Sequence, residues 1–103
     1  GGRSPSSVRF IVAVTLYNGG RVQFELNNRH EAGEYFDDAL ILVRDILSSS
    51  PSDEQDREAR RHCLPECGSL LHNIGQYKLE LGRTSNALGC FEEALQIRRS
   101  VEV

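Results

Sequence analysis

The sequence predicts an all-α protein built from two antiparallel helix–turn–helix hairpins. Two observations lead to this fold class. In residues 71–95, apolar side chains recur at the spacing of amphipathic helices, and Gly82 stands where a first helix would end. With a shift of 55 positions, residues 17–44 align with residues 72–99 at nine identities in 28 positions, where about two would arise by chance. A repeated supersecondary unit explains both observations.

The first element, residues 8–26, fits two secondary structures. Apolar residues alternate in residues 8–16 and again in 22–26, and the Asn-Gly-Gly sequence at 18–20 would suit the turn of a β-hairpin. A helix agrees with the 55-residue match to the more regular second copy. A lone hairpin would also have no sheet to join. We favour the helix, and the β-hairpin stays open as the alternative.

The second element is a helix of about four turns that ends before Pro51. Glu31, Glu34, Asp37 and Asp38 lie in its N-terminal half, where the helix dipole favours them. Three serines and the proline then interrupt the pattern. Its apolar stripe consists of Ala32, Phe36, Ala39, Leu40, Val43 and Leu47. The first hairpin is therefore assigned to residues 8–48, and residues 1–7, rich in glycine and serine, to a flexible linker.

Residues 49–68 are predicted to form an insert that extends the next helix. Residues 53–62 are polar on every face and contain acid–base pairs at i, i+4 spacing. Ser52 and Gln55 have the spacing of a capping box at its start. Pro65 is expected to kink or restart the helix, because it lacks an N–H and its ring crowds the preceding turn.

The second hairpin is assigned to residues 69–103. One face of its first helix carries Leu71, Ile74, Gly75, Lys78 and Leu81, and the stripe of its second helix carries Ala87, Leu88, Phe91, Ala94 and Leu95. Small residues between bulky ones let two helices approach closely. The residues expected to pack the two hairpins are Gly20, Ala32, Phe36 and Ala39 in the first copy and Gly75, Ala87, Phe91 and Ala94 in the second.

These residues resemble the tetratricopeptide repeat family, whose pattern is W-x2-L-G-x2-Y followed by A-x3-F. The second copy reads L-x2-I-G-x2-K from Leu71 and A-x3-F from Ala87, and the first copy repeats the small residues and the phenylalanine. The sequence NIG…FEEALQIRR is most similar to the kinesin light chain-like branch. The resemblance implies that the hairpins stack as a short right-handed α-solenoid with a concave groove.

The resemblance also implies a set of peptide-binding residues in that groove. Asn18 and Asn73 are equivalent in the two copies. In related repeats, asparagines at this place hydrogen-bond the backbone of an extended peptide, for which an amide offers both a donor and an acceptor. The neighbours expected to line the groove are Tyr17, Arg21 and Phe24 in the first copy and His72 and Gln76 in the second. Hydrogen bonding between helices, or packing against another repeat, is the alternative role for these residues.

Other functional classes find less support. The sequence has no G-x-S-x-G, no phosphate-binding glycine loop and no HExxH, so we expect neither an enzyme nor a cofactor. A net charge of −3 favours neither nucleic acid nor an anionic membrane, and no apolar run approaches the ~18–20 residues that span a bilayer. Cys63 and Cys67 with His62 and His72 offer a metal or redox site as a weaker alternative, since zinc sites usually show C-x2-C spacing.

The expected function is a non-catalytic protein–protein interaction module that binds a peptide or partner segment. A structural or self-associating repeat spacer without a peptide ligand is the alternative. The chain contains no methionine, which leads us to expect a piece of a longer repeat array. Three cysteines without the spacing of a disulfide framework indicate a reducing, cytoplasmic compartment.

Overall fold

A computed structural model describes residues 5–101 and shows four α-helices in this part of the chain. They are α1 (Ser6–Glu25), α2 (Arg29–Ser48), α3 (Glu54–Glu80) and α4 (Thr84–Val101). No strand occurs among the described residues. The predicted all-α fold of two helical hairpins is confirmed.

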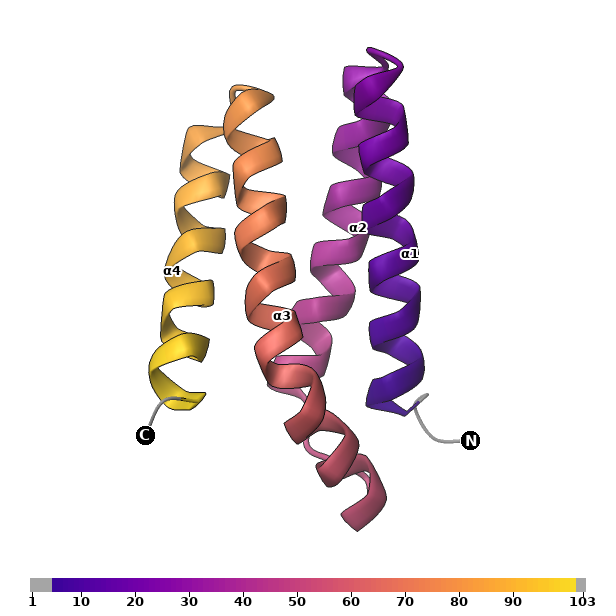
Figure 1. The fold of residues 1–103 in the computed structure, drawn as a ribbon, viewed down its shortest axis with the longest axis vertical. Coiled ribbons are helices and arrows are strands. Elements are labelled where there is room, and N and C mark those ends of the chain that lie inside the picture. Colours follow the sequence, from indigo (N-terminus) through magenta and orange to yellow (C-terminus); the bar gives the residue numbers. More distant parts are fainter. Residues whose placement is uncertain (1–4, 102–103) are drawn as a thin grey trace.

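The two hairpins stand beside each other, with α3 in the middle of the molecule (Figure 1). α1 pairs with α2, and α3 pairs with α4. α3 also packs against both helices of the first hairpin, and α4 lies at the opposite edge of the molecule from α1 (Figure 1). An ion pair between Arg44 of α2 and Glu93 of α4, at 2.6 Å, links α4 to the first hairpin. The shared core therefore lies between α3 and the first hairpin.

α1 is a helix, so the favoured interpretation of residues 8–26 is confirmed and the β-hairpin is wrong. Ala13 and Gly20 are buried, whereas Val8 and Val22 face outward. The alternating pattern was misleading because apolar residues lie on two sides of this helix. The linker assignment needs a correction too: residues 1–4 lie outside the described residues, and Ser6 is already helical and buried.

The two helix–helix turns have the same geometry at a distance of 55 residues. The N–H of Leu26 donates to the carbonyl of Val22, and the N–H of Leu81 donates to that of Tyr77. The next residue has positive φ in both turns, +64° at Asn27 and +82° at Gly82. Asparagine and glycine are the residues that tolerate this left-handed conformation at the end of a helix. The repeat seen in the sequence is therefore also a structural repeat.

The start of α3 differs from the expected capping box. Asp53, and not Ser52, caps the helix, and its carboxylate accepts a hydrogen bond from the N–H of Asp56 at 2.8 Å. The Asp56 carboxylate in turn accepts from the N–H of Ser6 at 2.9 Å, at the first turn of α1. Pro65 bends α3 without ending it, since helical structure continues through it and the N-terminal part diverges from the rest (Figure 1).

The core consists of small and medium apolar residues with one large ring at its centre. Its fully buried members include Ala13, Ala32, Phe36, Ala39, Val43, Ile46, Cys67, Leu71, Ile74 and Cys90. Two residues of the predicted stripe on α4 are not part of this core. Leu88 and Leu95 are exposed, and Cys90 and Ile97 are buried in their place. The predicted stripe is displaced around the helix because α4 packs on α3, where Ile97 lies against Gly68, while Leu95 lines the open space between the two helices.

Candidate interaction surface

Each hairpin is closed by a phenylalanine that lies over a glycine of the neighbouring helix. A Cβ atom added at Gly20 would lie 2.6 Å from Cε1 of Phe36, and one added at Gly75 would lie 2.8 Å from Cε1 of Phe91. No larger residue fits at either glycine without a shift of the ring. Ala32, Ala39 and Ala87 are also buried between the helices, and Ala94 is half-buried. The same contact in both copies fixes the structural equivalence of the hairpins.

The first hairpin presents this phenylalanine to α3, where an aromatic cluster joins the two hairpins. Tyr77 of α3 stacks on Phe36, with ring centroids 4.8 Å apart and an interplanar angle of 22°. Tyr17 and Phe24 of α1 meet Tyr77 edge to face, at 6.1 and 5.1 Å. Such pairs each contribute about 0.5–1.5 kcal/mol beyond the area they bury. Tyr17 and Phe24, predicted to line the groove, therefore take part in packing between the hairpins.

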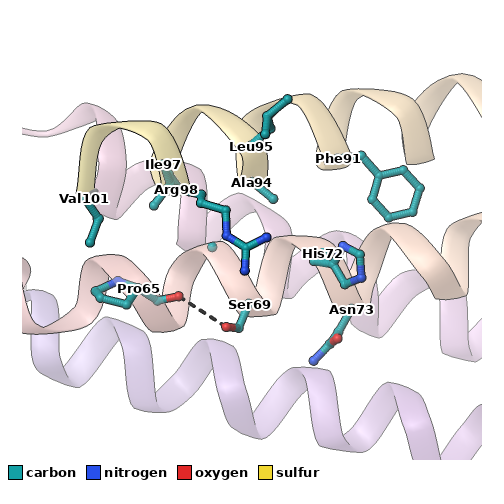
Figure 2. A pocket seen from close by; sticks show the side chains of 11 residues that line it. Pro65, Ser69, His72, Asn73, Phe91, Ala94, Leu95, Ile97, Arg98 and Val101 are labelled. Carbon is teal, nitrogen blue, oxygen red and sulfur yellow. Dashed lines mark hydrogen bonds between the residues drawn. The ribbon is translucent and has the colours of Figure 1, made fainter. Parts of the chain in front are cut away.

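Polar neighbours surround the rim of this cluster. Burial raises the pKa of Tyr17 above its ordinary value, the nearby Tyr77 adds to this, and Arg21 and a hydrogen bond with Asn73 act in the opposite direction. Hydrogen bonding with Tyr77 raises the pKa of Arg21, whose guanidinium carbon lies 5.8 Å from the centre of the Tyr17 ring. Asn73 is half-buried and points toward the first hairpin (Figure 2). These contacts bridge α1 and α3 and position the two helices.

The remaining predicted binding residues lie in different surroundings. Asn18 and Gln76 are exposed on α1 and α3. His72 is exposed as well, and its ring centroid lies 5.4 Å from that of Phe91. His72 and Phe91 are the counterparts of Tyr17 and Phe36, whose centroids are 5.9 Å apart. The predicted set is thus divided among the cluster that joins the hairpins, the exposed face of α1 and α3 that carries Asn18 and Gln76, and an open surface beside His72 on the second hairpin.

That open surface is a groove of about 640 Å³ between α3 and α4. Figure 2 shows His72 and Phe91 at one end and Pro65 and Val101 at the other, with Arg98 extending across the groove. The other lining residues are Gly68, Ser69, Asn73, Ala94, Leu95 and Ile97. The lining is mostly apolar, with the guanidinium of Arg98 across it and an imidazole, an amide and a hydroxyl from His72, Asn73 and Ser69.

The groove is the structural counterpart of the surface on which α3 lies. Moved by 55 residues, Ala94, Leu95 and Val101 correspond to Ala39, Leu40 and Ile46, which are buried in the core. Phe91 likewise corresponds to Phe36, on which Tyr77 stacks. Within residues 5–101, no helix covers the second hairpin in this way. The groove is therefore an uncovered counterpart of the surface on which α3 packs.

Ion pairs fix α3 in its own place on the first hairpin. Lys78, only 2% exposed, donates to the carboxylate of Asp37, and Arg83 donates to the same carboxylate at 3.1 Å. Burial acts to raise the pKa of Asp37, but hydrogen bonds and charge from Lys78 and Arg83 lower it below its ordinary value. Residues from α2, α3 and the second turn are thereby held together. The sequence pattern places Lys78 on the packing face of α3 but does not indicate that Asp37 is its partner.

The cysteines give little support to the metal or redox alternative. Burial raises the pKa of the Cys67 thiol to about 12, so almost no thiolate exists near neutral pH. Burial also raises the pKa values of Cys63 and Cys90. His62 pairs with Glu58 at 3.2 Å. Over residues 5–101, no group of three or more His, Cys, Asp or Glu side chains is arranged to hold a metal ion.

Comparisons with known proteins support the repeat interpretation for the second hairpin. Residues 68–102 match the family model of the tetratricopeptide repeat. No curated protein and no solved structure matches the chain. No helix of the described part is long and apolar enough to cross a membrane.

Proposed function

We propose that the protein is a non-catalytic protein–protein interaction module that binds a helical segment of a partner in the groove between α3 and α4. One observation carries the proposal: the groove lies at positions equivalent to the surface of the first hairpin on which α3 packs, and it keeps the phenylalanine, alanine and leucine of that surface as Phe91, Ala94 and Leu95. Tetratricopeptide repeats generally mediate protein–protein interactions, and the match over residues 68–102 supports the same role here.

The chemistry of the partner follows from the contacts that α3 makes. Tyr77 stacks on Phe36, and Leu70 and Ile74 are buried in the core that contains Phe36. A partner helix would place an aromatic or large aliphatic side chain over Phe91 and smaller apolar ones over Ala94. Apolar side chains at i, i+3/i+4 and i+7 would supply them, as in other helix-in-groove complexes.

The face that carries Asn18 and Gln76 is the second candidate site. Both residues are exposed, and they suit the extended peptide that the resemblance implies. Three of the predicted binding residues on this side are occupied, however: Tyr17 and Phe24 pack on Tyr77, and Asn73 turns toward the first hairpin. We therefore place the partner in the α3–α4 groove and treat the polar face as the competing location.

A selection of displayed random peptides against the whole chain tests the proposal. Leu95→Glu places a charge in the groove, and Leu95 is already 45% exposed, so folding should survive. We expect selected peptides to bind this variant at least about tenfold more weakly, because an apolar contact is replaced by a buried charge. Ile41→Gln is the matched control, since Ile41 is exposed and Gln96 stands at the equivalent position.

The polar face is tested with the pair Asn18→Ala and Gln76→Ala. Binding that survives Leu95→Glu but is lost in this double variant would place the partner on the face of α1 and α3 and contradict the groove. Binding unaffected by either variant would refute both sites.

We also propose, from the sequence resemblance, that the repeats belong to the kinesin light chain-like branch. The three cysteines are free thiols, and we propose a reducing, cytoplasmic location on that basis.

A further inference from the structure

We propose that the α3–α4 groove of one copy receives α1 of a second copy, so that the chain associates head to tail. The inference rests on the proposed function, because it names the occupant of the same groove. It is carried by a second surface, on α1, that matches the groove.

α1 exposes apolar side chains at the positions where α3 packs on the first hairpin. Val8, Val12, Val22 and Leu26 are all exposed on α1. Their counterparts 55 residues later are Cys63, Cys67, Tyr77 and Leu81, which belong to the core or pack against it. α1 thus carries the packing face of an inner helix, although nothing covers that face within residues 5–101. α1 and α4, which borders the groove, lie at opposite edges of the molecule (Figure 1).

Ile11 shows that the match is specific to position. It is 63% exposed on the same helix, and its counterpart on α3 is the exposed Glu66. This position therefore lies outside the packing face of α3. A second copy placed on the groove as α3 lies on the first hairpin would bury Val12 and Val22 and leave Ile11 in water.

The association is weaker than the packing within one chain, for two reasons. Thr15 and Gly19 of α1 stand where α3 has the buried Leu70 and Ile74, so less apolar surface is covered. Gln23 stands where α3 has Lys78, so the carboxylate on the neighbouring hairpin meets an amide instead of a cation. We expect dissociation constants between about 10 µM and 1 mM, the range of weak interfaces.

The geometry also sets the type of assembly. The two contacting surfaces are different, so each added copy leaves one groove and one α1 face free. A heterologous contact of this kind extends into open chains unless a rotation closes it. The average mass should therefore rise steadily with concentration, with no plateau at a dimer.

Sedimentation velocity of the whole chain, with one variant at each surface, tests the inference. Val22→Glu places a charge on the apolar face of α1, and Leu95→Glu places a charge in the groove. Both residues are exposed in a single copy, so neither variant should disturb folding. Each variant alone should associate at least about tenfold more weakly than the natural chain. A mixture should form a one-to-one complex and nothing larger, because the intact groove of one variant accepts the intact α1 of the other. Ile11→Glu, which copies Glu66, should associate like the natural chain.

The outcomes are distinct. A chain that stays monomeric up to about 1 mM, or variants that fail to complement each other while remaining helical by circular dichroism, would overturn head-to-tail association. If selected peptides then still bind in a manner that depends on Leu95, the proposed function survives with a different occupant. If they do not, both proposals are wrong.

Discussion

Alanine at the two equivalent glycines should affect stability unequally. Gly20→Ala and Gly75→Ala each introduce a methyl group beneath a phenylalanine ring. The added Cβ would lie 2.6 Å from Cε1 of Phe36 at position 20 and 2.8 Å from Cε1 of Phe91 at position 75. The rings differ in their freedom to move. Phe36 is 0% exposed and has Tyr77 stacked on it at 4.8 Å. Phe91 lines the open groove and is only half-buried.

Two opposing terms set the magnitude. Alanine is favoured over glycine inside a helix by about 1 kcal/mol. An overpacked core loses roughly 1–3 kcal/mol. At Gly20 the ring has nowhere to go, so we expect a net loss of about 1–2 kcal/mol in the free energy of unfolding. At Gly75 the ring can turn into the groove, so the net change should lie between zero and a gain of about 1 kcal/mol.

Urea unfolding followed by circular dichroism measures both values, and the slope of each transition shows whether cooperativity is unchanged. If Gly75→Ala destabilises the chain as much as Gly20→Ala, the ring of Phe91 is as confined as that of Phe36. The groove would then not be open, and the reasoning would fail.

Three further substitutions probe the first turn, the Lys78–Asp37 ion pair and the Asp56 carboxylate, which accepts backbone hydrogen bonds. Asn27→Gly should stabilise the chain by about 0.5 kcal/mol in urea unfolding, because glycine adopts positive φ without strain; a loss of stability would contradict this. Lys78→Met keeps the buried stem but removes the charge and should cost about 1 kcal/mol, a modest value because the Asp37 side chain is 45% exposed and keeps a second cation; a neutral result would refute the role of the pair. The pKa of Asp56 is lowered to about 2, chiefly by backbone N–H donors, so its contribution to stability is complete above pH ~4 and is lost as the pH falls toward 2. Asp56→Asn should flatten acid unfolding in that window, and an unchanged pH profile would contradict the assignment.

The sequence was sufficient to predict the hairpins because their packing is local. The spacing of Phe91 and Ala87, the glycine at position 82 and the repeat at 55 residues all reflect contacts within one hairpin or one turn. The helical structure of residues 8–26 followed from the repeat, since the alternation of that segment alone pointed to a strand. The two apolar sides of α1 produced that alternation: one side packs on α2 and the other is exposed.

The contacts between hairpins could not be predicted in the same way. Tyr77 aligns with Val22 in the repeat, and nothing local shows that its ring stacks on Phe36. Tyr17 and Phe24 were assigned to a peptide groove because aromatic residues often anchor interfaces. They do line an interface, between the two hairpins of this chain. Tyr77 of α3 is the signal in the sequence that points to this interface, because a third aromatic residue can pack with Tyr17 and Phe24.

Nuclear magnetic resonance would test the central claim, that the α3–α4 groove is a helix-binding site, most directly. The measurement is a titration of the ¹⁵N-labelled chain with a peptide from the display selection. The account predicts that the largest amide shifts map to the groove, at Ser69, Ala94, Leu95 and Val101. The peptide should become helical on binding. Shifts confined to Asn18, Arg21 and Gln76, with the groove unchanged, would contradict it.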